Sequence, residues 1–258
     1  MRGLLIRLFF LVLLLACAAG AGWWNREALR ELYRRYTAPA AEARPAPDPG
    51  TYSVLTADLS SHRARLGRDY RNARSEAERK AVLAQARKLL EAALPHLMEC
   101  WLGTPWDFNG MAEKPGHGKI ACGYFVSTIL RDAGFEVERV ELAQQASQNI
   151  LRTFLPEEDL VIRVGMRYER YLAEIERAGP GVFLVGLDSH VAFLVVGEAG
   201  IRFIHSSGQR PWCVVDESRR EAVTLQRSRY RVSGNLTANP GVLEGWLLGA
   251  PFKTFGSS

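Results

Sequence analysis

The chain has 258 residues, of which 47% are hydrophobic and 24% are charged. This is the composition of an ordinary globular protein, and it excludes collagen-like, low-complexity and largely disordered classes. Lysine and arginine number 33 against 28 acidic residues, a net charge of +5, and the two signs are mixed too evenly along the chain to indicate a nucleic-acid partner. Four cysteines are too few for a disulfide scaffold.

The amino terminus has the features of a secretion signal. A basic start is followed by an uninterrupted apolar run that ends at Cys17 and then by small residues. Residues 14–17 (LLAC) resemble a bacterial lipobox, which predicts a signal peptide over residues 1–16 and a lipid on Cys17. Cleavage after Ala21, an uncleaved signal anchor and a buried core helix are the alternatives. We therefore expect the protein in the cell envelope, anchored to the membrane and facing the periplasm.

Between this signal and the main domain the composition changes twice. Residues 23–36 are typical of a short amphipathic helix, whose tryptophans would lie either at a membrane interface or against the domain. Residues 37–50 hold four prolines among alanines, a composition that stays extended. We thus predict an N-terminal helix and tether over residues 17–50 and one folded domain over residues 51–258.

The first half of the domain has helical periodicity. Ser75 and Glu78 form a capping-box signature before an apolar stripe, and Pro95 should kink or restart that helix. Farther on, apolar residues recur at helical spacing from Cys122 until Gly134, which is placed as a C-terminal cap. This pattern predicts a short core helix with a cysteine in its first turn.

The second half of the domain is rich in short strands. Two further helices are expected, over about residues 140–155 and 166–178. After them come five runs of β-type residues: 182–187, 190–196, 201–206, 213–216 and about 228–233. Helices followed by an antiparallel meander predict an α+β fold.

Cys122 is the first candidate for chemistry because of its place at the start of a helix. Unpaired N–H groups and the positive end of the helix dipole would lower the pKa of its thiol and make it a nucleophile. The alternative is a small, buried and inert cysteine.

Two histidines in neighbouring strands strengthen the catalytic interpretation. If Glu198-Ala199 is a two-residue hairpin turn, His190 lies opposite Ser207 and His205 opposite Ala192. The two histidines then share one face as diagonal neighbours, with Cβ atoms roughly 7 Å apart. A three-residue turn without a bulge would place them on opposite faces.

Thiol, base and orienting group together make an activated nucleophile. Cys122 would attack a carbonyl carbon, His190 would hold the proton and deliver it to the leaving amine, and His205 would fix the tautomer of His190. The backbone N–H of Cys122 would donate to the oxyanion. The same three side chains are acceptable zinc ligands, but no close pair of ligands anchors a zinc site, so we expect neither metal nor cofactor.

Four segments of the chain together resemble the NlpC-type papain-like cysteine peptidases of bacterial cell walls. They are residues 103–110 (GTPWDFNG), 118–126 (GKIACGYFV), 190–193 (HVAF) and 203–205 (FIH). The resemblance spans about residues 98–208. It implies a papain-like NlpC-type domain, with helices packed on a β-meander and a catalytic core over about residues 98–233.

By this resemblance Cys122 is the nucleophile, His190 the base and His205 the third polar residue. Such enzymes commonly cleave amide bonds in peptidoglycan stem peptides, which would make a peptidoglycan peptide or another amide the substrate. The chain departs from the family pattern beside the nucleophile, where Ala121 and Gly123 replace the usual Asp and Ser. His190 follows Cys122 by sixty-eight positions, which leaves room for two extra helices near the cleft.

Other polar residues are candidates for the substrate cleft. Trp106 stands where the family often has an oxyanion-stabilising tyrosine, and Asp107, Asn109 and His117 lie in the loop that leads to the nucleophile. Asp107 also suits an Asx turn, and His117 an exposed loop position.

Cys100 and Cys213 are a candidate disulfide that would leave Cys122 reduced in an oxidising periplasm.

These observations predict a membrane-tethered cysteine hydrolase that cleaves an amide bond. The alternative is a non-catalytic anchored domain of the same fold that binds a cell-wall or protein ligand.

Overall fold

The computed structural model describes residues 45–256. The predicted signal peptide over residues 1–16, the lipidation site Cys17 and the predicted helix over residues 23–36 lie outside the described residues. The chain from Pro45 onward forms one unit through its internal contacts. Across residues 45–256, no helix is both long enough and apolar enough to cross a membrane.

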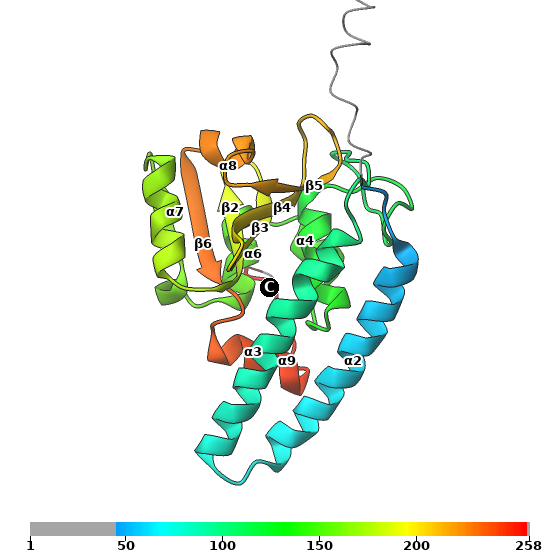
Figure 1. Cartoon of the computed structure of the whole chain (residues 1–258), viewed down its shortest axis with the longest axis vertical. Helices are drawn as coiled ribbons and strands as arrows, with labels where there is room; N and C mark the ends of the chain where they lie inside the picture. The colour runs from blue at the N-terminus through cyan, green and yellow to red at the C-terminus, as the bar shows by residue number, and fades with distance from the viewer. Residues whose placement is uncertain (1–44, 257–258) are drawn as a thin grey trace, which may run out of the picture. The chain divides into compact units, whose positions relative to one another are not determined.

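Two long helices, α2 (Pro49–Asn72) and α3 (Glu76–Glu99), lie side by side as a hairpin (Figure 1). Asp48 begins α2, since its carboxylate accepts a hydrogen bond from the Thr51 backbone N–H at 2.9 Å. Pro49 and Gly50, which we assigned to the tether, are therefore the first residues of this helix, and that boundary was wrong.

The capping signature before α3 is confirmed. The Glu78 N–H donates to the Ser75 hydroxyl at 3.1 Å, and α3 then continues through Pro95 to Glu99 rather than restarting. Leu94, Pro95 and Leu97 are all buried, so packing on the core outweighs the backbone hydrogen bond that a proline loses.

The remaining helices are shorter. They are α4 (Cys122–Asp132), α5 (Arg139–Ala143), α6 (Ser147–Phe154), α7 (Tyr168–Arg177), α8 (Val223–Arg227) and α9 (Pro240–Leu248). Cys122 and Gly134 mark α4 as expected, since Gly134 adopts a positive φ of 94° just after the helix. The helix expected over residues 140–155 is divided into α5 and α6, and α8 and α9 were not predicted.

The sheet has six antiparallel strands. They are β1 (Val161–Val164), β2 (Gly181–Leu187), β3 (Val191–Gly197), β4 (Gly200–Ser206), β5 (Val214–Ser218) and β6 (Tyr230–Asn235). Their order in space is β1-β6-β2-β3-β4-β5. The α+β class is confirmed, but only β2 to β5 form the expected meander, because β6 returns to lie between β2 and the unpredicted edge strand β1.

The sheet separates two buried clusters. Alternate residues of β2 enter one cluster or the other, with Val182 and Leu184 in the first and Phe183 and Val185 in the second. Helices α3, α4, α6 and α9 cover the first face, whereas α7 and α8 cover the second (Figure 1).

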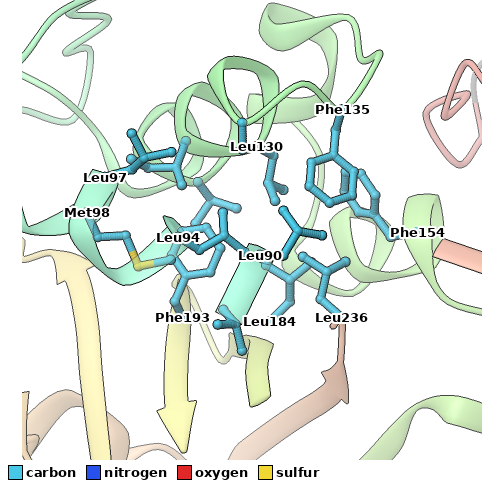
Figure 2. Close-up of a cluster of buried hydrophobic side chains, with 14 of the residues drawn as sticks. Leu90, Leu94, Leu97, Met98, Leu130, Phe135, Phe154, Leu184, Phe193 and Leu236 are labelled. Carbon is cyan, nitrogen blue, oxygen red and sulfur yellow. The ribbon is translucent and has the colours of Figure 1, made fainter. Parts of the chain in front are cut away.

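The larger cluster fixes the position of α4. Figure 2 shows Leu90 and Leu94 of α3 packed near Leu130 of α4 and Phe193 of β3. The rings of Phe125 and Phe193 meet edge to face with centroids 6.1 Å apart. This packing sets the beginning of α4 beside the beginning of β3.

Candidate active site

Cys122 is the first residue of α4 and lines a pocket of about 710 Å³. His190, which directly precedes β3, lines the same pocket. The packing of α4 on β3 therefore brings the predicted nucleophile and the predicted base to one cavity.

Gly123 lies close to the backbone of α5. A Cβ atom at this position would lie 2.2 Å from the Ala143 carbonyl oxygen of α5. Helix α5 lies in the segment between Cys122 and His190, so this segment and Gly123 fit closely against each other. A side chain larger than that of glycine at position 123 would collide with backbone atoms, which move aside less readily than a side chain does.

Gly123→Ala is expected to lower the free energy of unfolding by about 2–3 kcal/mol, since the new methyl group must displace α5. Urea unfolding measures this. Gly197→Ala is the matched control, because nothing lies within 4 Å of a Cβ atom built there. Equal stability of the two variants would contradict the close approach of α5.

The hairpin register predicted for the histidines is confirmed. Gly197 pairs with Gly200 across a two-residue turn, and Phe193 pairs with Ile204. A hydrogen bond of 2.7 Å joins His190 Nε2 to His205 Nδ1, and the two rings are nearly perpendicular at 85°. His190 Nδ1 is thus the ring nitrogen not used in this bond.

The hydrogen-bonded chain continues to an acid that sequence reasoning missed. Glu217 Oε2 lies 3.2 Å from His205 Nε2. Glu217 is in β5 directly opposite Phe203, so it shares a sheet face with His205. The strand expected over residues 213–216 ended before this position, whereas β5 continues to Ser218.

Burial governs the charge state of the histidine pair. His205 is only 1% exposed, and removal from water lowers its pKa to about 3. Burial, together with the neighbouring His205, lowers the pKa of His190 to about 3 as well. Both rings are therefore neutral at pH 7.

The expected low pKa of Cys122 is not found. Burial of the thiol raises its pKa, and the backbone N–H groups of Val191, Gly123 and Cys122 itself offset this only in part. The helix terminus acts in the predicted direction, but desolvation is the larger effect. The pocket consequently holds a neutral thiol and a neutral imidazole.

Alkylation of Cys122 by iodoacetamide is accordingly expected to rise only above the pH at which a free thiol, with a pKa near 8.5, reacts. Peptide mapping across pH 6–10 separates this cysteine from the others. Half-maximal modification well below pH 8 would show that a thiolate is stabilised in the resting protein.

The other predicted cleft residues divide into two groups. Trp106 and Asn109 line the pocket with Cys122. Asp107 does not, because its carboxylate accepts the Asn109 N–H at 2.9 Å and pairs with Lys119 at 3.1 Å. This is the Asx turn that was its alternative, so its placement in the cleft was wrong.

His117 was also wrongly placed in the cleft. It lines a separate pocket with residues of α2, such as Tyr52, and with Arg131. Its side chain is exposed, which matches the alternative of an ordinary loop position.

The remaining wall of the pocket is uncharged. Among the lining residues, all of them described, none is Asp, Glu, Lys or Arg. Those not predicted include Phe108, Met111, Tyr124, Gln144, Ser189, Gln209 and Thr224. Phe108 is 79% exposed at the mouth, and the Trp106 ring packs near Trp212 with centroids 5.6 Å apart.

A buried arginine holds the loop that forms one side of the pocket. Arg139 of α5 donates from Nε to the Thr128 hydroxyl at 2.7 Å and from Nη2 to the Ala112 carbonyl at 2.8 Å. Its guanidinium also lies 5.0 Å from the centre of the Tyr124 ring. Helix α5 thereby supports both this loop and helix α4, which begins at Cys122.

The candidate disulfide does not form. Cys100 is a buried free thiol. The backbone of Cys213 forms an isolated antiparallel β-bridge with Pro105. The suggested pairing was wrong, because nothing in the sequence fixed the distance between the two positions.

Within residues 45–256, no three histidine, cysteine or acidic side chains are arranged to hold a metal ion. His190 and His205 share a hydrogen bond through the nitrogens that would otherwise face a common ligand. No family model, curated protein or solved structure matches the chain.

Proposed function

We propose that the protein is a cysteine hydrolase of the papain-like NlpC type that cleaves an amide bond. The observation that carries this proposal is the shared pocket of Cys122 and His190, with His190 Nε2 held 2.7 Å from His205 Nδ1. A nucleophile, a base and an orienting group are the minimum set for covalent acyl transfer.

The neutral resting pair favours a general-base mechanism. His190 Nδ1 takes the proton from the Cys122 thiol as sulfur attacks the carbonyl carbon, so that no thiolate need be stable beforehand. The backbone N–H of Cys122, at the beginning of α4, donates to the developing oxyanion, and the helix dipole stabilises the same charge.

Collapse of this intermediate releases the amine, which receives its proton from the His190 imidazolium. The acyl group then remains on Cys122 as a thioester. Water activated by His190 hydrolyses the thioester, which returns the proton to sulfur and releases the carboxylic acid. His205 holds the imidazole in place through both steps.

The substrate we propose is a peptidoglycan stem peptide, on the resemblance of residues 98–208 to cell-wall peptidases. A lipid on Cys17 would hold the enzyme at the membrane of the cell envelope. The uncharged wall and the aromatic mouth of the pocket suit a peptide backbone and its apolar groups.

Incubation of the purified protein with peptidoglycan fragments, followed by mass spectrometry, tests this proposal. We expect products that differ from substrate by one water and one broken amide bond. Absence of products across muropeptides and simple peptide amides, together with measurable binding, would overturn it.

That outcome would favour a non-catalytic anchored domain that binds a cell-wall ligand. The raised pKa of Cys122 favours this binding domain over an enzyme, because a binding domain does not require a reactive thiol.

A further inference from the structure

We propose that Glu217 is a positioning residue that determines which nitrogen of His190 carries the proton. The inference deepens the proposed function, on which its kinetic consequence rests, but its structural part can be tested in the resting protein. Glu217 reaches His190 only through His205, and it lies outside the pocket that holds Cys122.

The direction of the hydrogen bonds follows from counting protons. A carboxylate only accepts, so an ionised Glu217 requires a proton on His205 Nε2. A neutral imidazole carries one proton, which leaves His205 Nδ1 as an acceptor. His190 Nε2 must then donate to it, and His190 Nδ1 is left bare. A bare Nδ1 is the state that can accept the Cys122 proton.

Protonation of Glu217 removes this constraint. A carboxylic acid can donate as well as accept, so the whole chain of hydrogen bonds can reverse. His205 then donates from Nδ1, His190 accepts at Nε2, and the proton of His190 moves to Nδ1. In that tautomer His190 cannot take a proton from the thiol. Ionisation of Glu217 therefore selects the basic tautomer.

The surroundings of Glu217 bring this ionisation near neutral pH. Its side chain is 19% exposed, and burial, with the negative charges of Glu221 and Asp216, raises its pKa to about 7. His205 faces it from β4 and Tyr168 from α7.

No lysine or arginine in the described chain neutralises Glu217. Arg202 of β4 pairs instead with Asp216 and Glu99. Asp216 alternates with Glu217 along β5, so this pairing is on the other face of the sheet.

The direct test is the tautomeric state of His190 in the resting protein, read from ¹⁵N NMR of histidine-labelled protein without substrate. At pH 8 we expect a bare Nδ1 and a protonated Nε2. Between pH 8 and pH 6 we expect the Nδ1-protonated form to appear. In Glu217→Gln, whose amide does not titrate, we expect this change with pH to vanish.

Glu221→Gln is the matched control, because it removes a neighbouring carboxylate that does not contact His205. We expect it to keep the wild-type tautomer at pH 8 and to move the transition to lower pH. Wild-type tautomers and wild-type pH dependence in Glu217→Gln would overturn the proposal.

Kinetics provide the second readout. We expect wild-type kcat to rise with an apparent pKa near 7, Glu217→Gln to lose that rise, and Glu217→Leu to lower kcat about tenfold or more without a matching change in KM. Retention of the wild-type pH profile in Glu217→Gln would count against Glu217. The NMR result holds if no hydrolysis is ever found, so failure of the proposed function and failure of this inference are distinguishable.

Discussion

Cys122→Ala is expected to lower kcat/KM for amide hydrolysis at least about 1,000-fold. The substitution removes the only thiol that lines the pocket, while His190, His205 and the backbone N–H of residue 122 stay in place. Because alanine fits at the beginning of a helix, we expect the unfolding midpoint to change little. Product release followed by mass spectrometry gives the rate.

Cys100→Ala is the matched control for this variant. Cys100 is a free thiol like Cys122, but it is buried at the end of α3 and does not line the pocket. We expect its activity to equal that of the wild type. Turnover that survives in Cys122→Ala would show that Cys122 is not the nucleophile. Equal losses of activity in the two variants would point to a general effect on folding.

Acid is expected to destabilise the protein through the buried histidine pair. The folded-state pKa values of His190 and His205, about 3, lie below the ordinary value of 6.5. Unfolding at a pH between these limits therefore takes up protons, so stability falls as pH falls from about 6.5 toward 3. Two such groups give a slope of at most about 2.7 kcal/mol per pH unit.

Glu217 acts in the opposite sense over part of this range. Its folded-state pKa of about 7 exceeds the ordinary 4.5, so between these values the folded protein holds a proton that the unfolded chain releases. The contribution of Glu217 to stability is present below pH 4.5 and is lost as pH rises through 7. Together, the three groups lead to a net uptake of about one proton on unfolding between pH 6 and 4.5. The free energy of unfolding therefore falls by about 1.4 kcal/mol per pH unit in this range, and more steeply at lower pH.

Urea unfolding between pH 4 and 8 measures these slopes. In a His190→Gln, His205→Gln double variant, we expect the contribution of the histidines to disappear, so that between pH 6 and 4.5 the remaining slope comes from Glu217 and has the opposite sign. An unchanged slope in this variant would contradict the buried, neutral pair.

Local sequence patterns predicted the parts of the site that depend on short-range geometry. A two-residue turn at Glu198-Ala199 fixes strand parity, which was enough to place His190 and His205 on one face. Helical periodicity between Cys122 and Gly134 was enough to place the thiol at the beginning of α4. Both predictions depend on residues that are close together in the sequence, so they depend little on tertiary packing.

Other elements were missed because their signals are sparse. Helix α2 buries Tyr52, Leu59 and Leu66 seven residues apart, a narrow stripe among charged residues. Strand β1 has four residues, and three of them are exposed at the sheet edge. Glu217 was lost because strand ends are poorly marked, and β5 extends two residues past the expected end.

The charge state of Cys122 could not be predicted from its neighbours in sequence. Its pKa depends on how far α4 and β3 exclude water, which is a property of the assembled fold. Likewise, the Cys100–Cys213 pairing depended on a distance between remote segments. Asp107 and His117 were assigned to the cleft because they lie in the loop that precedes Cys122. Whether a residue of this loop lines the cleft depends on the direction of its side chain, which the sequence pattern does not give.

Trapping of the acyl-enzyme tests the central proposal most directly. The protein is mixed with excess substrate and quenched in acid, and the intact mass is measured before peptide mapping. We expect an added acyl group on Cys122 that neutral hydroxylamine releases, as it does a thioester, and no adduct in Cys122→Ala. Turnover in which no acyl group forms on Cys122 during quenching at early times, or an adduct on any other residue, would contradict a covalent mechanism through this cysteine.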